Sequence, residues 1–341
     1  MSPLTCATVD LAPFFIDEGV VIGEAATPAQ LEAAAVIDRG CREHGFMHVV
    51  NFGLSAVLEK KAFAASRELF SLPESVKRSS LSRISLKNTG YAPFAFEHLN
   101  RARPADLKEA FNVREPRVHD NDFSGTPAGF EPVALELWSV IETAARRYAL
   151  ALALALGLET NYFTRTLERL DLCTCRFLHY PPCDAPTSSP DGQLAAIRVG
   201  EHTDFGAYTF LLLGEGARGL QVKPVRGGES GGAHGGENDS DWVDVEAPAT
   251  PDGTVGAIVN TGALLARWTN DVWRATAHRV IVPDAEVAAN DRYSIAIFID
   301  PDAEAPVAVD PRFVPPGEVA RYEPTTGLEY LMMKLKEAQG V

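Results

Sequence analysis

From Asp171 onward the sequence breaks into short β-prone runs separated by glycine, proline and aspartate. The runs are CTCRFLHY, YTFLLLG, GLQVKPV, DWVDVE, VGAIVNTG, WRATAHRVIV and RYSIAIFID. Many short strands with turn residues between them are typical of a β-sandwich or jelly roll, whereas βαβ units would place long helices between the strands. The sequence contains no dinucleotide fingerprint and no phosphate loop. The C-terminal half therefore predicts a β-rich jelly roll.

The N-terminal half has a mixed pattern of strands and amphipathic helices. Short strands are predicted at Thr8–Leu11 and Phe46–Asn51. Helices are predicted at about 27–44, 55–70, 131–156 and, near the C-terminus, 327–338. We therefore expect one structural unit, in which a non-catalytic α/β region (residues 1–165) packs on a jelly-roll core with a C-terminal helix (residues 166–341).

Charge and cysteine content narrow the possible partners and surroundings. The formal net charge of −15 repels phosphate backbones and anionic membranes, so we expect no nucleic-acid or membrane partner. Five cysteines without a repeated CxxC pair argue against a disulfide framework or a structural zinc site and favour a reduced, cytoplasmic setting. The N-terminus lacks the pattern of a signal peptide, and the apolar stretch Arg146–Leu158 is too short to span a bilayer. The oligomeric state stays open.

Three residues with metal-binding side chains fall in or beside the predicted strands. His202 and Asp204 would face the same way if both lay on a strand, and His278 is the one metal-capable residue of the run TAHRVIV. A jelly roll brings such distant strands side by side. Two imidazoles and one carboxylate suit Fe(II) with three open positions better than structural zinc, which takes four protein ligands. A surface pair unrelated to metal is the alternative for an isolated HxD.

Arg292 and Ser294 follow His278 by about one hairpin. Two residues apart on a strand, their side chains point to one side, where the guanidinium can hold a carboxylate by two hydrogen bonds and the hydroxyl can add a third. The alternative is an edge-strand arginine that pairs with a nearby acid. With the three metal-capable residues, this pair predicts an oxygen-activating iron enzyme that consumes a 2-oxo acid.

Longer stretches resemble a known family. HTDFG, NTGALLARWTNDVWRATAHRV and RYS are similar to the Fe(II)- and 2-oxoglutarate-dependent dioxygenases of the isopenicillin N synthase-like superfamily. The segment VDLAPFF…IDRGCREHGFMHVVNFGL resembles the N-terminal region of that family, so the likeness covers nearly the whole chain. RFLHYPP, GEHTDFG and LLARWTND look most similar to the microbial and fungal branch that includes thymine 7-hydroxylase-like enzymes. The resemblance implies a double-stranded β-helix (cupin-like) core.

The resemblance also implies a role for each matching position. The implied iron ligands are His202, Asp204 and His278. The implied 2-oxoglutarate-binding residues are Arg292, Ser294 and Tyr180. The implied substrate-pocket residues are Arg176, Phe205 and Phe298, although a purely structural role is an equal alternative for each of these three. No catalytic residue is expected beyond the metal ligands.

The sequence departs from the family pattern at three places. Leu178 stands where many plant relatives carry asparagine, so one polar contact to the co-substrate is expected to be missing. Ala263 stands where many relatives carry aspartate. The stretch between Asp204 and His278 is longer than usual, and the low-complexity run Gly227–Ser240 accounts for the excess. We expect that run to be a surface insertion.

The resulting expectation is an oxidoreductase that uses Fe(II), 2-oxoglutarate and O2 to oxidise a C–H bond of a small organic metabolite, with succinate and CO2 as co-products. Hydroxylation is the first expectation for the reaction, in a setting such as secondary metabolism. A 2-oxoglutarate-independent oxidase of the same fold, catalysing desaturation or ring closure, also keeps an Arg-x-Ser pair. A redox-inactive metal enzyme and a non-catalytic small-molecule receptor are the further alternatives. The sequence does not identify the substrate.

Overall fold

Two β-sheets form the centre of the molecule. The computed structural model describes residues 3–15, 26–84, 87–98, 100, 104–184, 197–224, 242–251 and 253–339. In spatial order, the larger sheet contains β1 (Thr8–Asp10), β2 (Phe46–Ser55), β10 (Thr254–Thr261), β7 (Tyr208–Leu213), β12 (Arg292–Ile299), β5 (Thr174–Tyr180), β4 (Glu109–Arg114) and β3 (Gly90–Ala92). The smaller sheet contains β6 (Ile197–His202), β11 (His278–Ile281), β8 (Leu220–Val222) and β9 (Val243–Asp244).

All of these neighbouring strands are antiparallel except the pair β1–β2. A further short pair, β13 (Pro306–Val307) with β14 (Thr325–Thr326), precedes the C-terminal helix. Strands from the N-terminal region occupy both ends of the larger sheet, and strands from the C-terminal region occupy its middle. This is the β-rich arrangement with surrounding helices that the spacing of the short runs predicts.

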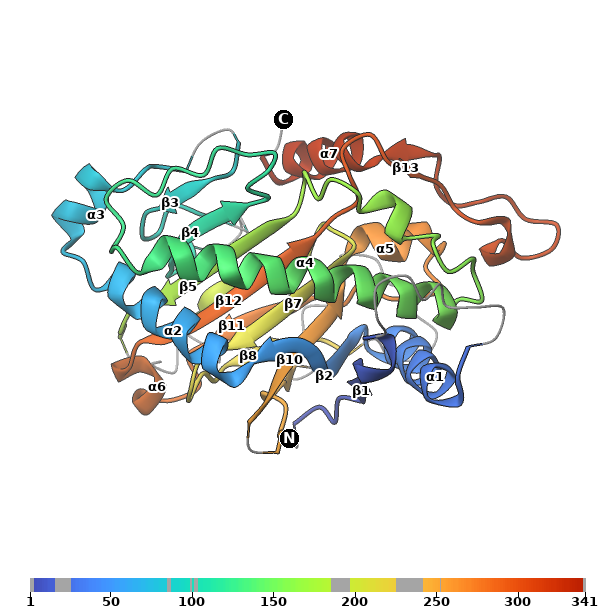
Figure 1. The fold of residues 1–341 in the computed structure, drawn as a ribbon, viewed down its shortest axis with the longest axis horizontal. Coiled ribbons are helices and arrows are strands. Elements are labelled where there is room, and N and C mark those ends of the chain that lie inside the picture. Colours follow the sequence, from blue (N-terminus) through green and yellow to red (C-terminus); the bar gives the residue numbers. More distant parts are fainter. Residues whose placement is uncertain are drawn as a thin grey trace, which may run out of the picture.

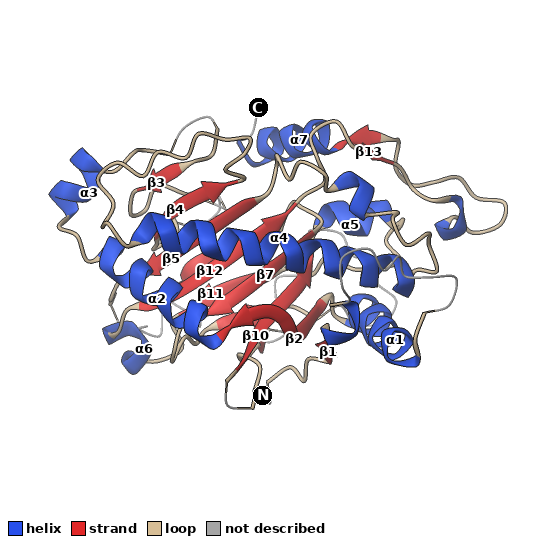
Figure 2. Ribbon diagram, in the orientation of Figure 1, coloured by secondary structure: helices blue, strands red, loops and turns tan. Residues whose placement is uncertain are grey.

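Helices cover one face of the larger sheet (Figures 1 and 2). The helices over this face are α1 (Pro28–Glu43), α2 (Ala56–Phe70) and α4 (Phe130–Ala155). The other described helices are α3 (Glu74–Ser80), α5 (Ala263–Trp268), α6 (Ala285–Ala289) and α7 (Gly327–Gln339), with 3-10 turns at Ala12–Phe14, Thr164–Thr166 and Pro311–Phe313. The long helix α4 runs across the strands, and α1 and α2 pack against it.

The positions of these helices follow from local sequence signals. Thr27 and Gln30 form a reciprocal capping box at the start of α1, where Pro28 occupies the first turn. Helix α4 buries an apolar face that includes Leu137, Ile141 and Leu152. The apolar stretch after Arg146 is therefore mostly the buried end of α4. In the described part of the chain, no helix has the length and apolar character needed to cross a membrane.

The structure corrects one predicted element and leaves another outside its range. The sequence analysis placed no strand before the HxD motif, yet β6 lies there and ends at His202. Asp204 follows in the loop to β7. The arrangement considered from the sequence, with His202 and Asp204 on one strand, is therefore wrong. The Gly-rich insertion at 227–240 lies outside the described residues.

A buried ion cluster joins α3 to the larger sheet. Lys77 Nζ donates to both carboxylate oxygens of Glu109, at 2.7 and 2.8 Å, and His179 Nδ1 lies 2.7 Å from Oε1. The Tyr91 hydroxyl donates to Oε2. Burial alone would raise the pKa of Glu109, but hydrogen bonds from His179, Lys77 and Tyr91 hold this pKa below its ordinary value. The carboxylate is therefore ionised, and it holds three strands and a helix together.

Glu109→Ala is expected to lower the free energy of unfolding by about 3–5 kcal/mol at neutral pH, because it removes the buried counterion of Lys77 and leaves that ammonium only the exposed Glu74 carboxylate at 3.4 Å. The folded-state pKa of Glu109 lies below the unfolded-state pKa, so its stabilisation is complete above the unfolded pKa and is lost as pH falls through the folded value. Urea unfolding should therefore show a difference between variant and wild type that shrinks in acid. Exposed Glu32→Ala is the control; equal effects at the two positions would contradict the prediction.

Candidate metal and co-substrate site

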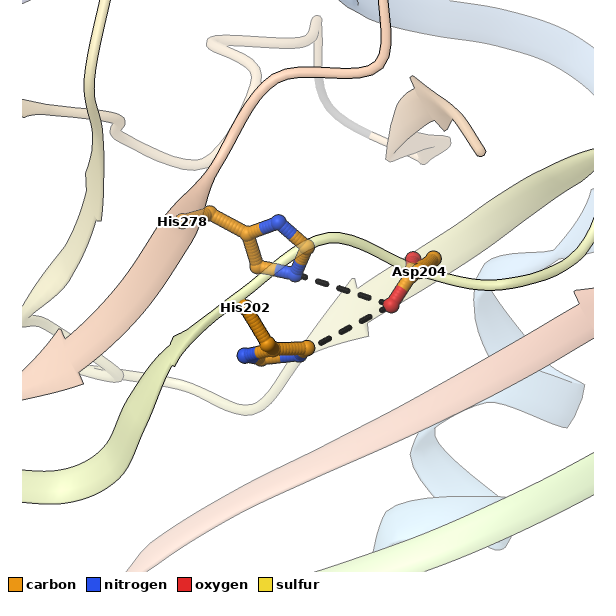
Figure 3. A group of neighbouring side chains, drawn as sticks. All are labelled: His202, Asp204 and His278. Atoms are coloured by element: carbon orange, nitrogen blue, oxygen red, sulfur yellow. Dashed lines mark ion pairs between the residues drawn. The ribbon is translucent and has the colours of Figure 1, made fainter. Parts of the chain in front are cut away.

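The three predicted metal-binding side chains come together between the two sheets. His278 on β11 pairs directly with His202 on β6, and their ring centroids lie 4.3 Å apart. The Nε2 atom of each histidine is 3.7 Å from Asp204 Oδ1 (Figure 3). The ligand atoms of all three residues lie within 4.8 Å of one another, so a single ion could contact all of them.

Two neighbouring side chains fix the orientation of the Asp204 carboxylate. Thr209 Oγ1 on β7 donates to Asp204 Oδ2 at 2.6 Å, and Asn260 Nδ2 on β10 donates to the same oxygen at 2.7 Å. Oδ1 is thereby left facing the two imidazoles. Such outer contacts hold a ligand in place before a metal binds. Sequence analysis missed Thr209 and Asn260, although each is a polar residue within a largely apolar strand.

Backbone carbonyls orient the two imidazole rings. His202 Nδ1 lies 2.8 Å from the carbonyl oxygen of Gly200, and His278 Nδ1 lies 3.3 Å from that of Thr276. A carbonyl oxygen only accepts hydrogen bonds, so in each ring Nδ1 is the nitrogen that carries the proton. Each Nε2 then carries the lone pair that a metal ligand needs, and each lies 3.7 Å from Asp204 Oδ1.

The electrostatics of the site favour the ligand forms of these groups. Burial, followed by the neighbouring His278, lowers the pKa of His202 to about 4, while Asp204 opposes that change. Burial alone would raise the pKa of Asp204, but the two histidines and the hydrogen bonds from Asn260 and Thr209 lower it. Neutral imidazole and ionised carboxylate are the forms that bind a metal ion. This N, N, O donor set with Oδ1 uncommitted fits Fe(II).

The triad forms part of the wall of a cavity that is lined by residues of both sheets. Along β12 the residues that line it are Arg292, Ser294, Ala296 and Phe298. Their cross-strand partners on β5 that also line it are Tyr180, Leu178 and Arg176. Thr209, Asn260 and the three metal-binding side chains line it as well. Phe205 is not part of the lining, so the cavity gives no support to its expected role as a pocket wall.

Arg292 is a buried cation at one end of this row, with a relative exposure of 3%. Its Nε donates to the Arg218 carbonyl at 3.2 Å, its Nη1 lies 3.5 Å from Ser294 Oγ, and its guanidinium lies 4.7 Å from the centre of the Tyr180 ring. Burial, opposed in part by Tyr180 and reinforced by Arg198, lowers the pKa of Arg292. Among the described residues no carboxylate pairs with it. A buried cation without a counterion is unfavourable, so this end of the cavity is suited to receive a carboxylate.

Arg176 lies farther along the same wall. It is paired across the strands with Ala296, four residues from Arg292 on β12, which corresponds to roughly 13 Å along the strand. Phe298 lies beyond it and also lines the cavity, and its role toward a substrate stays a prediction. Leu178, on β5, lies between the positions of Arg176 and Arg292 along the wall. An aliphatic side chain therefore borders the space where many plant relatives are expected to have an amide. The two arginines of the cavity wall are therefore separated along the strands, with Leu178 among the residues between them.

Comparisons with known proteins agree with this geometry. Residues 8–129 match the family model described as the N-terminal region of the non-haem dioxygenases in morphine synthesis, and residues 171–301 match the 2OG-Fe(II) oxygenase superfamily. Validamycin A dioxygenase of Streptomyces hygroscopicus subsp. limoneus is 30% identical over 300 residues, which cover 80% of this chain and 72% of that protein. A 2-oxoglutarate-Fe(II) type oxidoreductase of Emericella nidulans is 26% identical and covers 100% of this chain and 92% of that protein.

Among solved structures, full-length thymine 7-hydroxylase of Neurospora crassa in complex with alpha-KG superimposes with a TM-score of 0.76 and 27% identity. The match covers 97% of this chain and 95% of that chain. The same protein has also been solved with thymine.

Proposed function

Because the chain belongs to the 2OG-Fe(II) oxygenase superfamily, we propose that His202, Asp204 and His278 hold Fe(II), and that Arg292 holds the distal carboxylate of 2-oxoglutarate. Ser294 and Tyr180 assist Arg292. The observation that carries this proposal is a ligand triad with one uncommitted carboxylate oxygen, on the wall of a cavity that also contains an arginine without a carboxylate partner among the described residues.

The family membership confirms the expected fold class and reaction class. The core is the double-stranded β-helix of these oxygenases, and the protein is a non-haem dioxygenase that uses Fe(II), 2-oxoglutarate and O2. When bound, Fe(II) couples the decarboxylation of 2-oxoglutarate to succinate with the oxidation of a C–H bond in a small organic molecule. The rival interpretations as a redox-inactive metal enzyme or a receptor are thereby set aside.

The side chains of this chain position the reactants. Arg292 neutralises the distal carboxylate in a buried site, where a charge-assisted, two-point contact fixes the direction of the whole co-substrate. Leu178, Leu211 and Val280 contribute apolar wall that keeps water from the reacting atoms. Because the triad and Arg292 are held on or beside strands, both ends of the co-substrate meet preorganised groups.

We assign hydroxylation of a small metabolite as the specific reaction. A cavity lined by both sheets and a net charge of −15 support a small-molecule substrate over nucleic acid. The cytoplasmic location and the two-region division of the chain stay predictions.

The decisive experiment supplies anaerobically purified protein with Fe(II), 2-oxoglutarate and a panel of small metabolites, and then admits oxygen. We expect slow succinate formation without a metabolite and a marked rise with the correct one, accompanied by a product that has gained one oxygen atom. Omission of Fe(II) should remove both signals. A product formed without succinate would contradict the proposed use of Arg292. A product with two fewer hydrogens would replace hydroxylation by desaturation or ring closure.

A further inference from the structure

Four charged side chains form a network at the end of the cavity opposite Arg292. Lys108 Nζ lies 2.6 Å from Asp106 Oδ2 and 3.1 Å from Glu97 Oε2, and Glu97 also forms an ion pair with Arg176. Lys108 and Arg176 line the cavity, whereas the two acids hold them from behind. Asp106 and Lys108 are almost entirely buried, and the side chains of Glu97 and Arg176 are mostly buried.

This network carries no net charge. Burial alone would raise the pKa of Glu97, but Arg176 and Lys108 lower it to about 2, so Glu97 is ionised at neutral pH. Two cations therefore face two carboxylates. The other charged groups that line the cavity also balance once it is loaded, because Fe(II) and Arg292 together offset Asp204 and the two carboxylates of 2-oxoglutarate. A substrate that brought its own carboxylate would bury an uncompensated charge, which is strongly unfavourable.

One donor in the network nevertheless lacks a partner. The Nε atom of Arg176 is buried and makes no hydrogen bond, while its Nη2 is engaged by Glu97. Buried donors in native proteins are normally satisfied, so a group of the substrate is suited to accept from this one. A carbonyl oxygen supplies that acceptor without adding charge.

We propose that Glu97 sets the charge selectivity of the enzyme, so that the substrate presents a neutral acceptor, such as an amide or lactam carbonyl, to Arg176 rather than a carboxylate. The inference rests on the proposed iron and 2-oxoglutarate sites, because they determine the charge of the other groups that line the cavity. Glu97 is a specificity-determining residue in this arrangement: its negative charge neutralises cations that would otherwise attract an anionic substrate. Its position outside the cavity lining means that it acts through Arg176 and Lys108.

The test compares matched pairs of probes that differ only in charge, namely benzamide with benzoate and nicotinamide with nicotinate. Ligand-observed NMR measures their dissociation constants for protein loaded with 2-oxoglutarate and Zn(II), which has the charge of Fe(II) and supports no turnover. The wild type should bind the carboxamide of each pair more tightly. Glu97→Gln removes one negative charge, so it should change the ratio of the two dissociation constants at least tenfold in favour of the carboxylate. Arg176→Met removes one positive charge and should change this ratio in favour of the carboxamide.

Glu32→Gln, an exposed change on α1, should leave the ratio unaltered. The test is whether the preference for the carboxylate rises in the order Arg176→Met, wild type, Glu97→Gln. If Glu97→Gln does not fold, the comparison of wild type with Arg176→Met still tests the inference. A wild-type preference for carboxylates, an unchanged ratio in the variants, or no binding of either probe class would overturn the inference. Binding of 2-oxoglutarate and Fe(II) is measured on parallel samples. Loss of that binding in the wild type would instead overturn the proposed function.

Discussion

Asp204→Ala is expected to abolish Fe(II) binding and turnover together. Asp204 supplies the only negative charge among the three proposed ligands, and its Oδ1 is the atom that both imidazoles face. Removing it leaves two neutral nitrogens, too few to retain the ion against dialysis. Iron content after anaerobic loading and dialysis, together with succinate formation, measures both effects. His202→Ala and His278→Ala should behave in the same way.

Two further variants separate loss of a ligand from loss of the fold. Exposed Asp120→Ala should bind iron normally. Asn260→Ala keeps all three ligands but removes one of the two donors to Asp204 Oδ2, so it should lower iron affinity or activity by roughly 10- to 100-fold and not abolish it. Wild-type turnover in any ligand variant after added iron would show that the ion is held elsewhere.

Arg292→Ala is expected to raise the KM for 2-oxoglutarate by roughly 30-fold to several thousand-fold, which corresponds to about 2–5 kcal/mol for an unpaired buried carboxylate. The KM for the organic substrate should change far less, because Arg292 and Arg176 occupy separate positions along the cavity wall. Steady-state kinetics in which each substrate is varied in turn measures the two KM values separately.

Arg176→Leu provides the matched control, since it also removes a guanidinium from the same cavity. It should weaken binding of the organic substrate and spare Fe(II) and 2-oxoglutarate. If Arg292→Ala left the dependence on 2-oxoglutarate unchanged, the carboxylate would have to bind at another cation. If both variants gave the same pattern, the assignment of one arginine to each reactant would be wrong.

Features set by neighbouring residues were predictable from the sequence, and features set by strand register were not. The start of α1 depends on a capping box within four residues. An apolar strand such as β7 is recognised from its own short run of apolar residues. The contact of Thr209 and Asn260 with Asp204 depends instead on the pairing of β7 with β10, which places these two residues opposite each other. No local pattern encodes that register.

The charged network at Glu97 was out of reach for a similar reason. Its four members come from β5 and from the connection between β3 and β4, and their pairing becomes visible only when β4 lies beside β5. Strand β6 was missed because IRVGEH mixes charged, glycine and apolar residues without a clear alternation. The three metal-binding residues could be predicted because their chemistry limits the alternatives even where the local geometry is unknown.

The placement of N-terminal strands at both ends of the larger sheet bears on how the chain can be divided. Cutting before residue 166 would remove β2 from beside β10 and β4 from beside β5. Each newly bared strand would present a row of unsatisfied backbone amides and carbonyls, the surface through which sheets of different molecules join. The N-terminal region thus serves as protection against self-association, and an isolated C-terminal fragment should aggregate even though it contains every proposed iron ligand.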